Sequence, residues 1–247
     1  MIAFRLFFLY LVWLNSSELL ANKSVDYFAL LKKVDDLYRS QSSIAKIEMN
    51  IVTPDWSRTL VMDVWSQGKE KTFIRILSPQ KERGVSSLKL ATKMWNYFPK
   101  IDKVIKVPAS MLMGSWMGSD LTNDDMIKSY RYSDDFSYSG TLDSGDVVIT
   151  LTPKETTVSV WGKIVLFLDA KTYLPLKQDF YNEKSKKVRS MLYLEPKIIG
   201  SKNIPQVIEI IPLNKKGHKT IVRYKDLQLN VDVPDGTFKR QNLQKRI

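Results

Sequence analysis

The feature that most constrains the fold of this chain is a two-residue alternation of apolar and polar side chains that recurs along most of its length. Near the start, Ile47, Met49 and Ile51 alternate with polar or charged neighbours. Successive side chains of a β-strand point to opposite faces, so this spacing is typical of strands with one buried face. Proline, glycine or charged residues separate the segments. The pattern therefore predicts a mainly β protein with some helix, built from short strands joined by turns.

Strand segments of this kind follow one another closely enough to pair as antiparallel neighbours. We expect about eleven strands in a single large antiparallel sheet, curled into an unclosed barrel. One amphipathic helix precedes them, because Phe28, Leu31 and Val34 recur at helical spacing, with Ser24 as its cap and Arg39 near its end. The interior of such a barrel is too wide for its own side chains, so either this helix or an apolar ligand fills it. The clearest segments are 46–51, 60–64, 72–77, 86–91, 93–98, 147–152, 164–169 and 220–231.

Residues 1–21 have the pattern of a secretory signal peptide. Arg5 gives a positive start, residues 6–14 form a short apolar core, and Ala21 ends an acceptable cleavage site. The alternative is a membrane anchor, but this core is well short of the roughly twenty apolar residues that span a bilayer. We therefore expect export and cleavage, which leave residues 22–247 as one domain outside the cytoplasm.

The charge of the chain bears on its partners. The net charge is +12 at pH 7, and basic residues concentrate at 184–189, 215–219 and 239–246. These clusters suit an anionic membrane surface, and they suit simple solubility equally well. Nucleic acid is not an expected partner, because export removes the chain from it. The chain has no cysteine, which excludes disulfides, thiolate metal sites and a lipid-modified cysteine.

Catalytic chemistry has little support in the residues. The single histidine, His218, lies in a basic turn, so a histidine base, a histidine metal pair or a Ser-His-Asp triad lacks parts. Adjacent carboxylates occur at Asp124-Asp125 and Asp134-Asp135, but such pairs between strands are usually solvated turn residues. The sequence has no glycine-rich phosphate loop and no calcium-loop spacing. We expect a protein that is not an enzyme and that uses neither a cofactor nor a metal.

The most unusual segment is 110–118, which holds three methionines and Trp116 among small residues. Flexible glycine, soft methionine and a bulky tryptophan suit a loop or short helix that closes over a pocket. Packing of this segment against the sheet is the alternative. A short helix should follow at 124–127, capped by Asp120 or Asn123.

Two runs in this region carry a resemblance to a known family. The first is Trp95-Asn96-Tyr97-Phe98-Pro99, which ends a predicted strand, and the second is Gly118-Ser119-Asp120, which follows about twenty residues later. Together they resemble the bacterial outer-membrane lipoprotein-sorting proteins, the LolA-like family. The resemblance implies an unclosed barrel with a helical lid, located in the periplasm, whose concave face shelters acyl chains of lipoproteins or other lipids. It also implies a non-enzymatic carrier with membrane-protein partners at the inner and outer membranes, among them exporters of the resistance-nodulation-division class.

The acyl pocket implied by this resemblance should draw on the helix, the first strands and the methionine-rich segment. Strand parity slips easily by one residue, and alternating apolar residues also form plain cores, so a filled core is the alternative to a pocket. A periplasmic regulatory module of the same fold, which senses lipid and acts through protein contacts, is the alternative function. The residues that we expect to line the pocket are Phe28, Leu31, Met49, Ile51, Leu60, Met62, Val64, Leu88, Leu90, Trp95, Tyr97, Met113 and Trp116.

Overall fold

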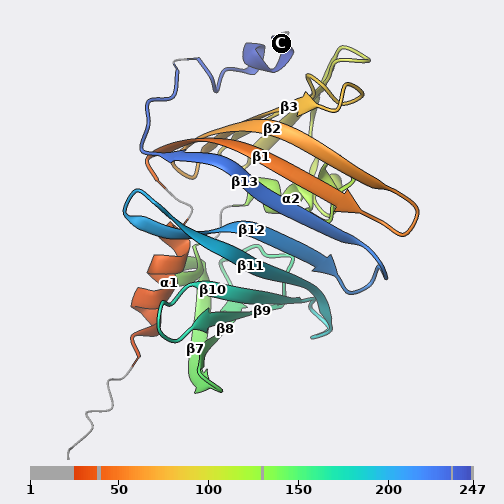
Figure 1. The fold of residues 1–247 in the computed structure, drawn as a ribbon. Coiled ribbons are helices and arrows are strands. Elements are labelled where there is room, and N and C mark those ends of the chain that lie inside the picture. The colour runs from red at the N-terminus through yellow and green to blue at the C-terminus, as the bar shows by residue number, and fades with distance from the viewer. Residues whose placement is uncertain (1–24, 38–39, 129–130, 235, 246–247) are drawn as a thin grey trace, which may run out of the picture.

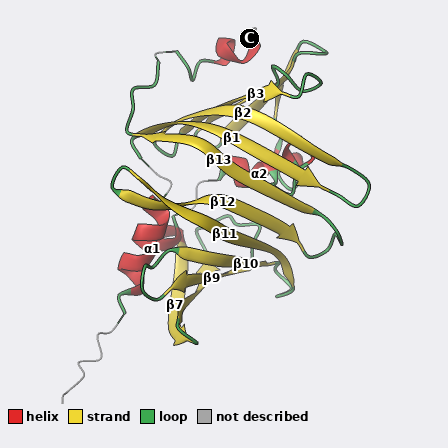
Figure 2. Cartoon of the chain, in the orientation of Figure 1, coloured by secondary structure: helices red, strands yellow, loops and turns green. Residues whose placement is uncertain are grey.

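The computed structural model describes residues 25–37, 40–128, 131–234 and 236–245. The predicted signal peptide lies outside these ranges, as do Ser24 and Arg39 at the predicted helix ends. The described residues form a strand-rich molecule with few helices (Figure 2). Its elements are α1 (Tyr27–Asp36), β1 (Ser42–Val52), β2 (Ser57–Gln67), β3 (Lys71–Ser78), β4 (Ser86–Leu90), β5 (Lys93–Phe98), β6 (Lys103–Lys106), the 3-10 helices η1 (Ala109–Met111) and η2 (Trp116–Gly118), α2 (Asn123–Ile127), α3 (Tyr132–Asp135), β7 (Phe136–Asp143), β8 (Asp146–Pro153), β9 (Lys163–Asp169), β10 (Pro175–Tyr181), β11 (Lys187–Ile199), β12 (Lys202–Pro212), β13 (Lys219–Leu229) and η3 (Arg240–Gln244).

One antiparallel sheet contains all the strands that the structure describes (Figure 1). The strands from β1 to β6 follow one another across one half, and those from β7 to β13 follow one another across the other half. β1 pairs with β13 in the middle, so strands from the two ends of the domain join the halves. β6 and β7 are the outer edges and do not pair with each other. This arrangement confirms the predicted large antiparallel sheet that does not close.

The expected number of strands was too low, since the sheet has thirteen rather than about eleven. The two edge strands, β6 and β7, have the weakest strand pattern in the sequence. β6 has only four residues, and most side chains of β6 and β7 are exposed, so neither strand carries a clear apolar alternation. Such segments become strands because a neighbouring strand offers them a complete row of hydrogen-bond partners.

The helix ends differ in detail from the predicted ones. α1 forms as expected and ends at Asp36, and its N-cap is Asp26, whose Oδ1 accepts a hydrogen bond from the Ala29 amide at 3.0 Å. α2 also forms as expected, but neither Asp120 nor Asn123 caps it. Thr122 is the cap, in a reciprocal capping box with Asp125. Within the described ranges, no helix has both the length and the apolar character needed to cross a membrane.

The helices cover one face of the sheet, which we call the inner face, and they cover it in two parts. α1 packs on the second half, where Leu30 and Leu31 join a core that includes Phe136, Ile149 and Leu166. The crossover, defined here as residues 107–127 between β6 and α3, covers the first half instead. The inner face therefore has two separate covers, α1 over the second half and the crossover over the first.

The outer face of the first half is also covered. Phe73, Leu88 and Tyr97 form a third core with Leu243, which is fully buried. Leu243 belongs to η3, near the end of the described chain, and the Ser86 hydroxyl donates a hydrogen bond to its carbonyl at 2.7 Å. The C-terminal segment thus returns to cover β3, β4 and β5 from outside.

Candidate functional site

The crossover is held to the first half of the sheet by Trp116. Its side chain is 2% exposed, and its indole Nε1 donates a hydrogen bond to the Ser87 hydroxyl at 3.2 Å. The Ser119 hydroxyl in turn donates to the Trp116 carbonyl at 2.7 Å, which closes the short turn around the left-handed Met117. The Gly-Ser-Asp motif therefore begins as a device that positions a buried tryptophan.

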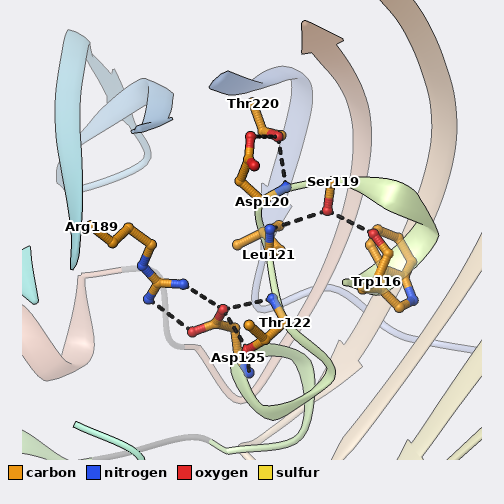
Figure 3. Close-up of polar contacts among 8 residues, drawn as sticks. All are labelled: Trp116, Ser119, Asp120, Leu121, Thr122, Asp125, Arg189 and Thr220. Carbon is orange, nitrogen blue, oxygen red and sulfur yellow. Dashed lines mark hydrogen bonds and ion pairs between the residues drawn. The ribbon is translucent and has the colours of Figure 1, made fainter. Parts of the chain in front are cut away.

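The remainder of the motif and the residues after it tie the crossover to the second half of the sheet, as Figure 3 shows. The Asp120 amide donates to the Thr220 hydroxyl at 2.9 Å, and that hydroxyl donates to Asp120 Oδ2 at 2.8 Å, which anchors the crossover to β13. Five residues later, Asp125 accepts two hydrogen bonds from the Arg189 guanidinium, at 2.6 and 3.0 Å, which anchors it to β11. Such a two-point pairing fixes orientation as well as position.

Arg189 has an unusual environment for a charged residue, since its side chain is 5% exposed. Its guanidinium lies 4.5 Å from the Trp161 ring centroid and 4.2 Å from the Phe180 centroid. Cations over aromatic faces are stabilised by the ring quadrupole. The aromatic cage and the Asp125 carboxylate together offset the desolvation of this arginine.

The neighbouring Asp124 is also buried, which corrects the expectation that this carboxylate pair is solvated. Its side chain is 1% exposed and lies 3.1 Å from the Lys128 ammonium. Burial raises the pKa of Asp124, and Lys128 opposes that shift. Both acidic residues of the pair thus have charged partners, Lys128 for Asp124 and Arg189 for Asp125. In the ranges that the structure describes, no group of three His, Asp or Glu side chains stands close enough to hold a metal ion.

Several cavities border the crossover, and three of them adjoin its anchors or its methionine-rich segment. The central cavity, about 400 Å³, lies between α1, the crossover and β9 to β11. The rim cavity, about 610 Å³, lies between the crossover and the loops that follow β1, β3 and β5. The side cavity, about 310 Å³, lies on the other side of the methionine-rich segment, against β11 and the β12–β13 turn. The last two share Ser115 as a lining residue.

The central cavity is a poor acyl site because its lining carries a polar network. Tyr193 donates to the Gln178 side chain at 2.8 Å, and Gln178 donates to the Tyr132 hydroxyl at 3.2 Å. Burial raises the pKa of Tyr132 to about 12 and that of Tyr193 well above its usual value, so both phenols are neutral. The Arg189–Asp125 pair lines the same cavity.

The rim cavity has the opposite character. Aromatic and thioether side chains dominate its wall, and its size lies within the range typical of small-ligand pockets. Its polar lining includes the ion pair between Arg58 and the buried Glu82, 2.9 Å apart, and the exposed side chains of Lys81 and Lys100. The apolar lining residues are Trp56, Val85, Phe98, Pro99, Met111, Trp116 and Met117.

The predicted pocket residues fall into several groups. Trp116 lines the rim cavity and Met113 lines the side cavity. Leu31 is buried beneath α1, whereas Phe28 on the same helix is 43% exposed. The predicted residues of β1 and β2 lie in the inner core beneath the crossover, and those of β4 and β5 lie in the outer core beneath the C-terminal segment. The inner group is Met49, Ile51, Leu60, Met62 and Val64, and the outer group is Leu88, Leu90, Trp95 and Tyr97.

Other lining residues were not predicted. Met111 and Met117 belong to the methionine-rich segment, and Phe98 belongs to the Trp-x-Tyr-x-Pro run. All three residues therefore had a signal in the sequence. Trp56 had none, because it lies in a turn between β1 and β2 whose place beside the crossover depends on the whole sheet. A ligand-binding role for any of these residues stays a prediction.

Solved structures share this architecture. A DUF1329 family protein from Desulfovibrio piger superposes with a TM-score of 0.79 at 22% identity, covering 88% of this chain and 97% of that one. A protein described as an outer membrane lipoprotein-sorting protein domain, from Vibrio parahaemolyticus, gives 0.76 at 20% identity, covering 89% and 97%. A LolA superfamily protein from Nitrosomonas europaea gives 0.72 at 21% identity, covering 87% and 97%. The fold is therefore that of the lipoprotein-sorting, LolA-like proteins.

The sequence itself places the chain in a family. A family model whose description reads "Uncharacterized protein" matches residues 68–245, most of the domain. The chain belongs to this family, and it shares its fold with the DUF1329 family protein and the LolA superfamily protein described above. No curated protein sequence matches the chain.

Proposed function

We propose that this protein is a non-enzymatic carrier that binds acyl chains of lipoproteins or other lipids and moves them between membranes. The rim cavity is the observation that carries the proposal. It combines a mainly apolar wall with two exposed lysines, Lys81 and Lys100, which suits an amphiphile with one apolar chain and a polar head. The fold shared with a protein described as lipoprotein-sorting supports the same class of cargo.

The energetics of such binding need no specific polar contact. Burial of a methylene is worth about 0.8 kcal/mol, so a few ordered acyl carbons suffice for useful affinity. Met111 and Met117 line the rim cavity, and Met113 lines the adjoining side cavity. Unbranched thioether side chains repack easily around guests of different length. The same softness favours release when a membrane competes for the chain.

The remaining features of the proposal concern location and partners. Residues 1–21 direct export and are removed, the mature domain of residues 22–247 acts in the periplasm, and it exchanges cargo with membrane proteins. An inner-membrane exporter of the resistance-nodulation-division class is the proposed donor or acceptor. A pull-down from a bacterial envelope extract, with the mature domain as bait, tests this partner.

The first experiment is native mass spectrometry of the mature domain purified from a bacterial periplasm. Co-purified phospholipid or acylated peptide is the expected result. A clean apo mass that takes up no lipid on challenge would overturn the proposal.

A blocking variant locates the site. Ser115 is exposed and lines both the rim cavity and the side cavity, so Ser115→Trp fills their shared wall without adding charge. We expect at least roughly tenfold weaker binding of a fluorescent fatty acid, because several methylenes lose their apolar contacts. Ser139→Trp is the matched control, since Ser139 is exposed on edge strand β7 and lines none of these cavities. Equal affinity of the two variants would place the acyl site elsewhere.

A further inference from the structure

One end of the sheet collects exposed apolar side chains. Antiparallel hairpins alternate between the two ends of a sheet, and here the turns at 53–56, 79–85, 99–102, 182–186 and 213–218 share one end, at the right of Figure 1. We call it the loaded end, and it includes the methionine-rich segment. Thirteen large apolar side chains are exposed among the described residues, and five of them lie here. These five are Trp56, Ile101, Met111, Met113 and Leu213.

The turns of the loaded end lie against one another. A Cβ atom placed on Gly217 would come within 3.0 Å of Pro54 Cγ, so the β12–β13 turn touches the β1–β2 turn. The Leu213 amide donates to the Val188 carbonyl at 2.8 Å, which holds the β10–β11 hairpin beside them. The apolar tips therefore form one surface.

The same surface is basic. Seven exposed cations stand in these turns, whereas the hairpin turns of the opposite end, at 68–70, 91–92, 144–145, 170–174 and 200–201, contain only Lys69 and Lys171 among their described residues. Four acidic residues, Asp55, Glu82, Asp102 and Glu183, stand in the same turns, and Glu82 is paired with Arg58, so the cations outnumber the acidic residues. No ion pair among the described residues engages the seven cations. They are Lys81, Arg83, Lys100, Lys184, Lys186, Lys215 and Lys216.

From this combination we propose that the loaded end docks on an anionic phospholipid bilayer, with the five apolar tips in the interface and the cations against lipid phosphates. Basic residues near an anionic membrane surface each strengthen attachment, and aromatic and thioether side chains partition into the headgroup region. A soluble acidic partner would match the charge but would leave unexplained five exposed apolar side chains on four separate segments.

The proposal rests on the carrier function and deepens it. The rim cavity is lined by Trp56, Lys81, Lys100 and Met111, and the side cavity by Met113 and Lys215. Both cavities thus open among the residues that would meet the bilayer. A docked molecule would pass an acyl chain between membrane and cavity without exposing it to water.

The test is co-sedimentation of the mature domain with phosphatidylcholine vesicles that contain about 30% phosphatidylglycerol, an anionic lipid. Lys184→Glu/Lys216→Glu should lower the partition coefficient by at least about tenfold, since two attractive charges become repulsive. Lys93→Glu/Lys171→Glu makes the same change in net charge at exposed positions of the opposite end and should have little effect. Equal losses in the two double variants, or no binding of the unaltered protein, would overturn the proposal.

The apolar contribution has its own matched pair. Ile101→Ser/Leu213→Ser removes two tips that are 57% and 50% exposed, and Leu142→Ser/Ile198→Ser removes two side chains that are 63% and 74% exposed away from the loaded end. Only the first pair should weaken vesicle binding. An equal effect of both pairs would contradict insertion of the tips.

Acyl binding without vesicles separates this proposal from the carrier function. Lys184 and Lys216 line neither the rim cavity nor the side cavity, so their double variant should bind a fluorescent fatty acid normally. Acyl binding without vesicle binding in the unaltered protein would overturn docking alone. Vesicle binding without acyl binding would overturn the carrier function and leave the docking surface standing.

Discussion

At the residue scale, the buried charged residues of this protein form ion pairs and hydrogen bonds that hold neighbouring segments together. Arg189 of β11 reaches Asp125 of the crossover, and Asp179 of β10 gathers Lys177, Lys187 and the Ser190 hydroxyl. Removal of one partner from a buried pair is costly, because it leaves the other charge desolvated and unpaired. Such residues therefore have sharper effects on stability than their solvent-exposed counterparts.

We predict that Arg189→Leu lowers the free energy of unfolding by about 3 kcal/mol, because Asp125 loses a two-point partner and remains 15% exposed. The free energy of unfolding of Arg189→Lys should lie between those of the unaltered protein and Arg189→Leu, since an ammonium keeps the charge but cannot make the parallel pair of hydrogen bonds. Urea unfolding of the mature domain measures both. Lys93→Leu, at an exposed position, is the control and should stay within about 0.5 kcal/mol. If Arg189→Leu left the free energy of unfolding unchanged, the Arg189–Asp125 pair would not be what holds the crossover.

Asp179 gives a pH-dependent prediction. Burial acts to raise its pKa, but hydrogen bonds from Lys187, Ser190 and Lys177 outweigh that effect and hold the pKa below its usual value of 3.8. A carboxylate with a lowered pKa in the folded state contributes stability that is present above 3.8 and disappears as pH falls through the folded-state pKa. Asp179→Asn should therefore cost about 2 kcal/mol at pH 7, and this difference should shrink below pH 3.8. Urea midpoints across pH test it, and a constant difference would contradict it.

At the scale of the elements, the sequence predicts where strands lie more reliably than it predicts which face of the sheet each side chain occupies. Alternation assigned Met49 and Met62 correctly to the side that the helices cover, because β1 and β2 have one clearly apolar row in that region. β4 defeats the same reasoning, since Ser86, Ser87, Leu88 and Lys89 are all buried. The polar row of β4 is buried against the crossover, where Ser87 accepts a hydrogen bond from Trp116, so polarity does not mark the outer side of this strand.

The missing information lies far along the chain. Leu243 and Phe238 cover the face that holds Trp95 and Tyr97, and Arg240 lies 5.3 Å from the Trp95 ring centroid. Nothing near Trp95 in the sequence announces a cover that begins more than a hundred residues later. The rim cavity was hidden for the same reason, because Trp56 and Met111 meet only when the sheet is complete.

The C-terminal segment should be a structural element in its own right. Leu243→Ala removes a fully buried side chain from the outer core, so we expect a loss of 2–5 kcal/mol, in the range typical of buried Leu→Ala changes. Leu213→Ala is the control, because Leu213 is 50% exposed and should change stability by less than about 0.5 kcal/mol. Thermal or urea unfolding distinguishes them. Similar small effects would mean that the segment is not packed on β4 and β5.

At the scale of the whole molecule, the two halves of the sheet are joined by the pairing of β1 with β13, the last strand of the chain to form part of the sheet. β1 completes its pairing only when β13 is in place, and the residues paired between the two strands are about 170 to 190 positions apart in sequence. Pairing at such a distance has a high entropic cost before contacts form, so assembly of the complete sheet is expected to be slow. The crossover then spans the joint on the inner face, with one anchor on β13 and the other on β11.

This arrangement predicts that the crossover can loosen while the sheet persists. Asp120→Ala/Asp125→Ala removes the side-chain contacts of both anchors and leaves only the Asp120 amide bonded to Thr220, and Asp125→Ala also removes half of the capping box of α2. Hydrogen exchange should then accelerate at least roughly tenfold across residues 107–127, while β1 and β13 keep their protection, because their hydrogen bonds belong to the ladder and not to the anchors. Asp232→Ala, at an exposed position, is the control. If β1 and β13 lost protection together with residues 107–127, the crossover would be part of one cooperative unit with the sheet and could not open separately to admit an acyl chain.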